Sequence, residues 1–327
     1  MRKFLSLVLV VLNIVLLCGC SVKETIASDK QEYIVSALGF DSDGEKIKMT
    51  IEAIVINSDD LKEDKENKLF SGVGETVEEA LGDIISQVTQ PLSLGHGAVA
   101  VMGSDLNPTQ TEKVFSFLND NGEINIAIML VYTKSASELL NVKPLSSVAV
   151  GYDIMSMLEV SEEEKGTAFN NRLYEVNSLK FEEMKTYYLP FVGIEDEKPL
   201  VKGLGVFKDN CQVRVLENKE IPLFCLARDS FTKGEFTLEN EKFKVDYSAV
   251  TYDFKLKENL KINLSLRLKK QNNKEILKAE IENFLKGYDV CALGNVIRQK
   301  EPKIWKKIKD NYEDFYKRAD IKVNIYE

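Results

Sequence analysis

The first twenty residues constrain this chain more than any later stretch. Arg2 and Lys3 provide a positive start, and an almost unbroken run of Leu, Val, Ile and Phe extends from Phe4 to Leu17. A short segment of cysteine and glycine follows, so that the run ends in Leu17-Cys18-Gly19-Cys20. A positive start, a short apolar run and small residues in this order are typical of a secretory signal peptide.

The four residues from Leu17 to Cys20 resemble a bacterial lipobox, in which a signal peptidase cuts before a lipid-modified cysteine. In this interpretation Leu17, Cys18 and Gly19 form the recognition sequence, and Cys20 begins the mature chain with a diacylglyceryl group on its sulfur. The alternative is a short transmembrane anchor with an unmodified cysteine. The apolar run has 14 residues, whereas a spanning helix needs about 20, so its length favours the lipoprotein.

The rest of the chain has the composition of a folded ectodomain. Cleavage before Cys20 removes 19 of the 327 residues and leaves 308, which suggests two or three domains. No later segment is long and apolar enough to span a bilayer. The net charge of −9 becomes about −11 without Arg2 and Lys3, so the surface is a poor match for nucleic acid. A lipid rather than surface charge must therefore hold the protein at a membrane.

The cysteines give no sign of a disulfide framework. Of the five, Cys18 is removed and Cys20 is acylated in the lipoprotein interpretation, which leaves Cys211, Cys225 and Cys291. Cys211 and Cys225 could bridge, but an odd number cannot all pair within the chain, and no spacing resembles a zinc site. Three buried small hydrophobic residues are the favoured interpretation.

The first half of the ectodomain alternates strand and helix patterns. Strands over 33–39 and 47–55 are expected to form a hairpin, with Asp43-Gly44 in the turn. Thr76 with Glu79 predicts a capping box at a helix start, and Asn107-Pro108 predicts a second helix start. Further strands are expected over 97–102 and 124–132, with another helix from Ser135. Such alternation predicts a mixed sheet with helices packed on it.

The second half begins after a charged loop that ends in a proline, Glu195 to Pro199. A hairpin over 201–207 and 212–216 turns at Asp209-Asn210. The clearest alternating strand is Leu260 to Leu268, a helix over 275–286 is stopped by Gly287, and a last helix begins at Pro302. The predicted class is α+β, with three domains that each combine a sheet and helices. The proposed divisions are a signal peptide (1–19), a lipidated tether (20–30), an N-terminal domain (31–195), a small middle domain (200–242) and a C-terminal domain (243–327).

No catalytic set holds together in this sequence, and no cofactor is expected. The single histidine, His96, lies between glycines, where a structural role is favoured over ligand binding. Gly72-Val-Gly74 precedes a helix and could offer backbone N–H groups to an anion, but neighbouring glutamates would repel it. The aromatic residues around Trp305 follow helical spacing and are expected to form a core face.

Five blocks along the chain resemble the C-subunit lipoproteins of spore germinant receptors, the Ger(x)C family. The first is the lipobox, and the second is an early apolar strand that ends in Gly39-Phe40-Asp41. The remaining blocks, in chain order, are Gly74-Glu-Thr76 followed by Gly95-His96, then Gly203-Leu-Gly-Val-Phe-Lys208, then Asp289 to Gly294 with Arg298, Pro302 and Trp305. The last block is the most specific. Asn119-Asp120 stands where the family tends to have Arg-Asp.

The resemblance implies a non-enzymatic subunit that a lipid anchors to the outer face of the spore inner membrane. It further implies two partners, a membrane-spanning A subunit and a transporter-like B subunit, in a complex that responds to small nutrients. Whether this subunit itself contacts the nutrient is left open. The alternative function is that of a lipid-anchored solute-binding protein associated with a transporter.

Overall fold

The computed structural model describes residues 32–55, 67–145, 148–165, 169, 171–231, 233–269 and 273–326. The predicted signal peptide and the tether before Glu32 lie outside this range, as do the predicted lipobox residues Leu17, Cys18 and Gly19 and the attachment site Cys20. Glu32 to Glu327 forms one compact unit. None of the described helices is long and apolar enough to cross a bilayer.

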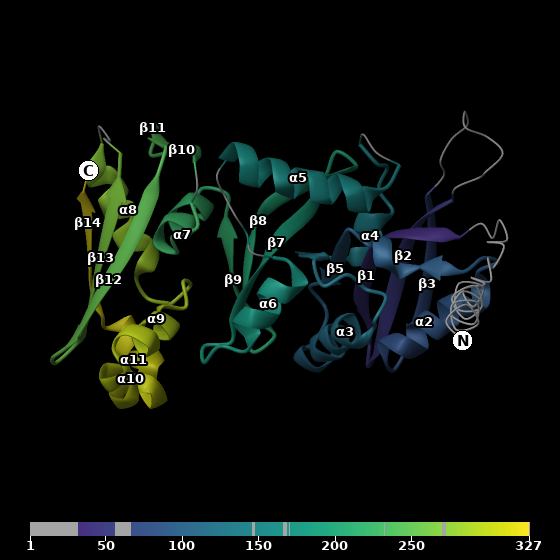
Figure 1. Cartoon of the computed structure of the whole chain (residues 1–327), viewed down its shortest axis with the longest axis horizontal. Helices are drawn as coiled ribbons and strands as arrows, with labels where there is room; N and C mark the ends of the chain where they lie inside the picture. Colours follow the sequence, from purple (N-terminus) through teal and green to yellow (C-terminus); the bar gives the residue numbers. More distant parts are fainter. Residues whose placement is uncertain are drawn as a thin grey trace, which may run out of the picture. The chain divides into compact units, whose positions relative to one another are not determined.

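A large mixed sheet organises the first two-thirds of this unit (Figure 1). Its strand order is β3-β2-β1-β5-β6-β7-β8-β9, with β4 beside the start of β1. The four central strands β1, β5, β6 and β7 run parallel, and antiparallel hairpins extend the sheet at both ends. The bounds are β1 Tyr33–Asp43, β2 Lys46–Val55, β3 Asn67–Gly74, β4 Leu92–Ser93, β5 Val99–Gly103, β6 Met129–Thr133, β7 Thr186–Glu195, β8 Lys198–Lys208 and β9 Cys211–Glu217.

Helices cover both faces of this sheet because the side chains of its central strands alternate between two cores. Val99, Val101 and Val131 point into one core, together with α4 (Ala136–Leu140) and α5 (Val150–Lys165). Ala100 and Leu130 point into the other, with α2 (Val77–Gln87), α3 (Pro108–Asp120) and α6 (Leu173–Lys180). Strands buried on both faces are expected where crossover helices connect parallel neighbours.

A smaller three-stranded sheet forms the C-terminal part. β13 (Leu260–Leu268) pairs antiparallel with β12 (Ser248–Leu256) and parallel with β14 (Asp320–Tyr326). The five leucine and isoleucine side chains of β13 are buried, as its alternation predicts. The remaining elements are α7 Ile221–Ala227, the hairpin of β10 Gly234–Leu238 and β11 Glu241–Val245, α8 Lys274–Leu285, α9 Leu293–Lys300, α10 Pro302–Ile308, the short 3₁₀ turns η1 Leu94–His96 and η2 Lys309–Asn311, and α11 Tyr312–Lys317.

The large sheet runs through the point at which a boundary is predicted. Asp196 and Glu197 form a two-residue turn with positive φ, and β7 and β8 pair along their length on either side of it. The sheet therefore includes strands from both sides of Glu195–Pro199. The division into three domains stays a prediction, whereas the mixed α/β class, with helices packed on sheets, describes the structure.

Several local predictions are confirmed. β1 and β2 form the expected hairpin, and the Thr76 hydroxyl accepts a hydrogen bond from the Glu79 backbone N–H. Asn107 and Gln110 form a complete capping box at the start of α3. The strand expected over 124–132 is shorter, Met129–Thr133, because residues 121–128 instead form turns held by Asn121 and Asn125.

Helix α5 is held against the sheet by a buried carboxylate on β2. The fully buried Glu52 accepts hydrogen bonds from the backbone N–H groups of Val150 (2.7 Å) and Gly151 (2.9 Å), and from the Ser36 hydroxyl (2.7 Å). Ser36 occupies a bulge in β1, and a Cβ at Gly151 would lie only 2.6 Å from the Ser36 carbonyl oxygen. The first turn of α5 thus rests directly on the bulge, with its unpaired N–H groups satisfied by Glu52.

Replacing Glu52 with alanine should destabilise the protein by about 2–5 kcal/mol, because two buried N–H groups would lose their acceptor. The Glu52→Gln variant keeps an acceptor oxygen and should lose less. Equilibrium urea unfolding followed by circular dichroism measures both, with Glu78→Ala on the exposed face of α2 as the control. Equal midpoints for Glu52→Ala and Glu78→Ala would contradict this role.

Candidate functional site

The most specific block of the sequence, from Asp289 to Trp305, builds the start of α9. The Asp289 carboxylate is buried and accepts hydrogen bonds from the backbone N–H groups of Leu293 (2.8 Å) and Gly294 (3.0 Å). It accepts a third from the Tyr312 hydroxyl at 2.6 Å. Ala292, the residue before the helix, has φ of 54° and provides no side-chain cap. Asp289 therefore caps α9 from outside the helix and ties it to α11.

The charge of Asp289 is compensated by its surroundings. Burial raises the pKa of its carboxyl above the ordinary value, while the three hydrogen bonds and the nearby Arg228 oppose that shift. Arg228 is half-buried and has polar partners. It donates to the Tyr188 hydroxyl at 2.7 Å and to the Cys291 carbonyl oxygen at 3.1 Å. Through these contacts Arg228 connects β7, the end of α7 and the segment before α9.

Gly294 lets the C-terminal helices approach the loop before β7. A Cβ at this position would lie 2.5 Å from the Met184 sulfur and 3.2 Å from the Trp305 ring. Trp305 in turn packs edge-on against Tyr312, with ring centroids 5.2 Å apart. The expectation that Trp305 belongs to a core face is confirmed, since its side chain is buried in the core.

Polar contacts complete this junction. The Met184 backbone N–H donates to the Asn295 side-chain oxygen at 3.0 Å, and the Asn295 amide donates to Glu182. On the neighbouring strand, Lys208 forms an ion pair with Glu313 of α11 at 2.5 Å. Each contact joins the large sheet to the C-terminal helices, so the two parts are fixed by directional bonds as well as by apolar packing.

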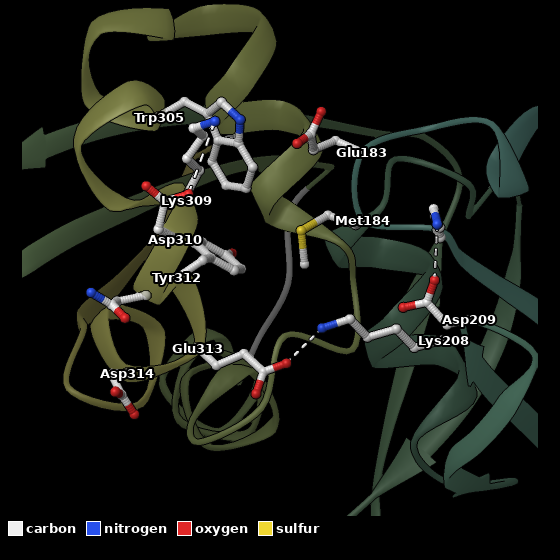
Figure 2. A pocket seen from close by; sticks show the side chains of 12 residues that line it. Glu183, Met184, Lys208, Asp209, Trp305, Lys309, Asp310, Tyr312, Glu313 and Asp314 are labelled. Atoms are coloured by element: carbon white, nitrogen blue, oxygen red, sulfur yellow. Dashed lines mark hydrogen bonds and ion pairs between the residues drawn. The ribbon is translucent and has the colours of Figure 1, made fainter.

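A cleft of about 460 Å³ opens beside this junction (Figure 2). Figure 2 shows the Lys208 ammonium pointing toward Glu313, with Met184 close to the middle of the group of labelled residues. A second ion pair, Lys185 to Asp209 at 3.3 Å, lies on the sheet side. The residues that line this junction cleft are Glu183, Met184, Lys185, Lys208, Asp209, Trp305, Lys309, Asp310, Asn311, Tyr312, Glu313 and Asp314.

A second cleft of about 420 Å³ lies between α3, α6 and the turn before β9. On its floor the Lys180 ammonium lies 3.5 Å from the Phe115 ring centroid and 3.0 Å from the Glu112 carboxylate. Asn210 donates to the same carboxylate at 2.7 Å and accepts from the Tyr187 hydroxyl at 3.2 Å. Burial lowers the pKa of Lys180, and the Glu112 pair opposes that shift. The charges of this α3–α6 cleft thus satisfy one another.

Both clefts offer binding surface, and Lys185 and Asp209 line each of them. In the described part of the chain, no group of three or more His, Cys, Asp or Glu side chains could hold a metal ion. The lining lysines Lys180, Lys185 and Lys208 form ion pairs with carboxylates of other elements or turns.

The other sequence candidates have local structural positions. His96 is exposed in η1, at the edge of the sheet where β5 begins. Gly72 and Gly74 lie in β3, where a Cβ would come within 2.5 Å of α2 backbone atoms, so these glycines serve helix packing. Cys211, Cys225 and Cys291 are free, which excludes the Cys211–Cys225 bridge. Cys225 and Cys291 are buried as expected, but Cys211 is exposed because it begins the edge strand β9.

Most residues of the junction carry no local signal in the sequence. Arg228, Asn295 and Lys208 act through partners 40 to 113 residues away in the chain. No local spacing indicates such pairs. The sequence signal that could have indicated Arg228 is its position directly after the apolar segment Ile221–Ala227. In the structure this segment is the buried helix α7.

Replacing Asp289 with alanine should cost about 2–5 kcal/mol of unfolding free energy, because α9 loses its cap and the Tyr312 hydroxyl loses its acceptor. The Tyr312→Phe variant removes one donor and should cost about 1 kcal/mol. Urea unfolding gives both values, with Asp253→Ala on the exposed face of β12 as the control. A loss for Asp289→Ala no larger than that of the control would show that the cap is dispensable.

Comparisons with known proteins agree across both halves of the chain. A family model described as "Spore germination protein N-terminal domain" matches residues 30–194, and one described as "Spore germination B3/GerAC like, C-terminal" matches residues 202–326. Spore germination protein GerQC of Bacillus cereus is 24% identical over 295 residues, which cover 90% of this chain and 79% of that protein. The crystal structure of the GerBC protein aligns with a TM-score of 0.49 at 16% identity, covering 88% of this chain and 95% of that one. The chain therefore belongs to the GerAC, or Ger(x)C, family of spore germination proteins.

Proposed function

We propose that this protein is a lipid-anchored, non-enzymatic subunit of a membrane receptor complex that triggers spore germination in response to small nutrients. The observation that carries this proposal is the match of both halves of the chain to one spore germination family. The relative GerQC is itself named a spore germination protein. In this role the protein works through its partners, the membrane-spanning A and B subunits.

The anchor is the lipobox. Cleavage before Cys20 and acylation of its sulfur would hold the folded unit, which begins near Glu32, at the outer face of the spore inner membrane. Attachment to a surface raises the effective concentration of the protein for a membrane partner, so that modest interfaces suffice for assembly. The acidic composition suits contact with basic surfaces, which would make assembly sensitive to salt.

The two clefts support a role in recognition. Several of their lysines are paired with carboxylates from elements that are distant in the chain, such as Lys208 with Glu313 and Lys180 with Glu112. Such a lining presents fixed charges and backbone groups to a partner. The lining lysines are held in ion pairs, not beside a nucleophile. The surface is therefore suited to binding, and the chemistry of the response would belong to the complex.

Replacing Cys20 with alanine should abolish acylation and reduce germination in response to at least one nutrient. Agents that bypass nutrient receptors should still work, since the rest of the spore is unchanged. Mass spectrometry of the membrane-extracted protein and germination assays with each nutrient measure the two effects.

The matched control is Cys211→Ala, which removes an exposed cysteine from β9 and should leave both acylation and germination unchanged. Normal responses to every nutrient in the Cys20→Ala strain and after deletion of the gene, in a spore former without a redundant receptor, would defeat the proposal.

A further inference from the structure

The outer surface of α6 carries exposed apolar side chains in a row. Phe181, directly after the helix, has 90% of its surface exposed, and Tyr174, two turns earlier on the same side, has 47% exposed. Ile126, 61% exposed, lies beside Tyr174, whose backbone N–H donates to the Ile126 carbonyl oxygen at 3.1 Å. We call these three residues the α6 stripe. Single exposed apolar residues are ordinary, but an aligned set is typical of an interaction surface.

The stripe is held by ordered backbone structure. The Phe181 N–H donates to the Asn177 carbonyl oxygen at 3.1 Å. The amides of Asn177 and Asn119 exchange hydrogen bonds, which joins α6 to α3. Phe181 is also part of the lining of the α3–α6 cleft, so the stripe continues into a concave surface. A binding partner would therefore meet a largely preformed site and pay little ordering entropy.

The charges around the stripe indicate what kind of partner fits. The floor of the cleft is neutralised internally, because Lys180 is paired with Glu112. Asp120, which ends α3, and Glu183, two residues after Phe181, are exposed, and their carboxylates form no ion pair or hydrogen bond within the described part of the chain. The stripe thus has carboxylates near it that remain uncompensated. Lysine or arginine on a partner would be attracted to them, whereas an anionic lipid surface would be repelled.

The position of the stripe in the fold brings it toward the anchored end of the chain. β1, β5 and β6 run parallel, with Ala37 opposite Val99 and Val99 opposite Met129. The first residues of β1 and of β6 therefore lie at the same end of these parallel strands. Ile126 lies three residues before β6. The 12 residues from Cys20 to Gln31 span at most about 40 Å when fully extended. A lipid on Cys20 would therefore hold the start of β1 within about 40 Å of the membrane.

From these observations we infer that the α6 stripe and the adjoining cleft bind a segment of a membrane-spanning partner subunit in which an apolar side chain is flanked by lysine or arginine. This inference rests on the proposed function. The apolar side chain would cover Phe181 and enter the cleft, while the basic groups would face Asp120 and Glu183. Aromatic side chains at the centre of an interface commonly account for much of its binding energy.

The test uses the full-length, affinity-tagged protein in a spore former with an epitope-tagged A subunit. After detergent extraction, the A subunit recovered with the tagged chain is measured for the wild type and for Phe181→Ser. Recovery should fall about tenfold in the variant, as expected for loss of a central aromatic contact. The control Tyr247→Ser removes an exposed aromatic residue from the loop after β11 and should recover the A subunit normally.

Charge is tested separately. The double variant Asp120→Lys/Glu183→Lys should also lose recovery, and added salt should weaken the wild-type complex. The matched double variant Glu45→Lys/Glu258→Lys, which changes net charge equally at exposed positions elsewhere, should retain recovery. Unchanged melting temperatures show that all four variants fold.

The outcomes separate this inference from the proposed function. Full recovery of the A subunit by Phe181→Ser and by the double variant would overturn the inference and leave the proposed function standing. No recovery by the wild-type protein would count against both. If Phe181→Ser releases only a second tagged copy of this chain, the stripe is a homodimer contact. If Phe181→Ser lowers the amount of the protein that stays in the membrane fraction, while the A subunit recovered per tagged chain is unchanged, the stripe contacts the bilayer. Either result would overturn the proposed occupant.

Discussion

The structure depends on carboxylates buried at the N-termini of helices. Asp41 accepts from the backbone N–H groups of Ala136 and Ser137 at the start of α4, Glu52 does the same for α5, and Asp289 does so for α9. A helix start leaves N–H groups unpaired and carries partial positive charge, so a carboxylate satisfies both. Burying that carboxylate is costly unless its bonds are complete. Each helix is therefore held in one position against the element that supplies the carboxylate.

The buried Asp289 also affects the two clefts, because it fixes the position of α9. With its first turn fixed by Asp289, α9 places Gly294 against Met184 and Asn295 within hydrogen-bonding distance of the Met184 backbone. Met184 is followed directly by Lys185, which pairs with Asp209 and lines both clefts. The shape of both clefts is thus linked to one buried carboxylate in the C-terminal part. Ion pairs on the surface add specificity more than stability.

The blocks that resemble the Ger(x)C family are mainly architectural. Asp41 and Asp289 cap helices, Gly74 admits α2 onto β3, and Gly205 leaves room for the Tyr132 and Phe207 rings. Such residues are recognisable in sequence because backbone geometry permits few alternatives at these positions. A partner surface has no such requirement, since many side chains can provide apolar or charged contact. The family resemblance therefore identified the fold more readily than the α6 stripe.

The sequence by itself determined the local elements and the family. Alternation in Leu260–Leu268 and the capping residues Thr76 and Asn107 are patterns of neighbouring residues, whose physics is local. Only the tertiary structure decided that β7 and β8 continue one sheet, that Ile221–Ala227 is a buried helix, and that Glu52 caps α5. An apolar run without periodicity fits a strand or a helix equally well. A carboxylate, moreover, finds N–H donors 98 residues away only after the sheet and its crossovers have formed.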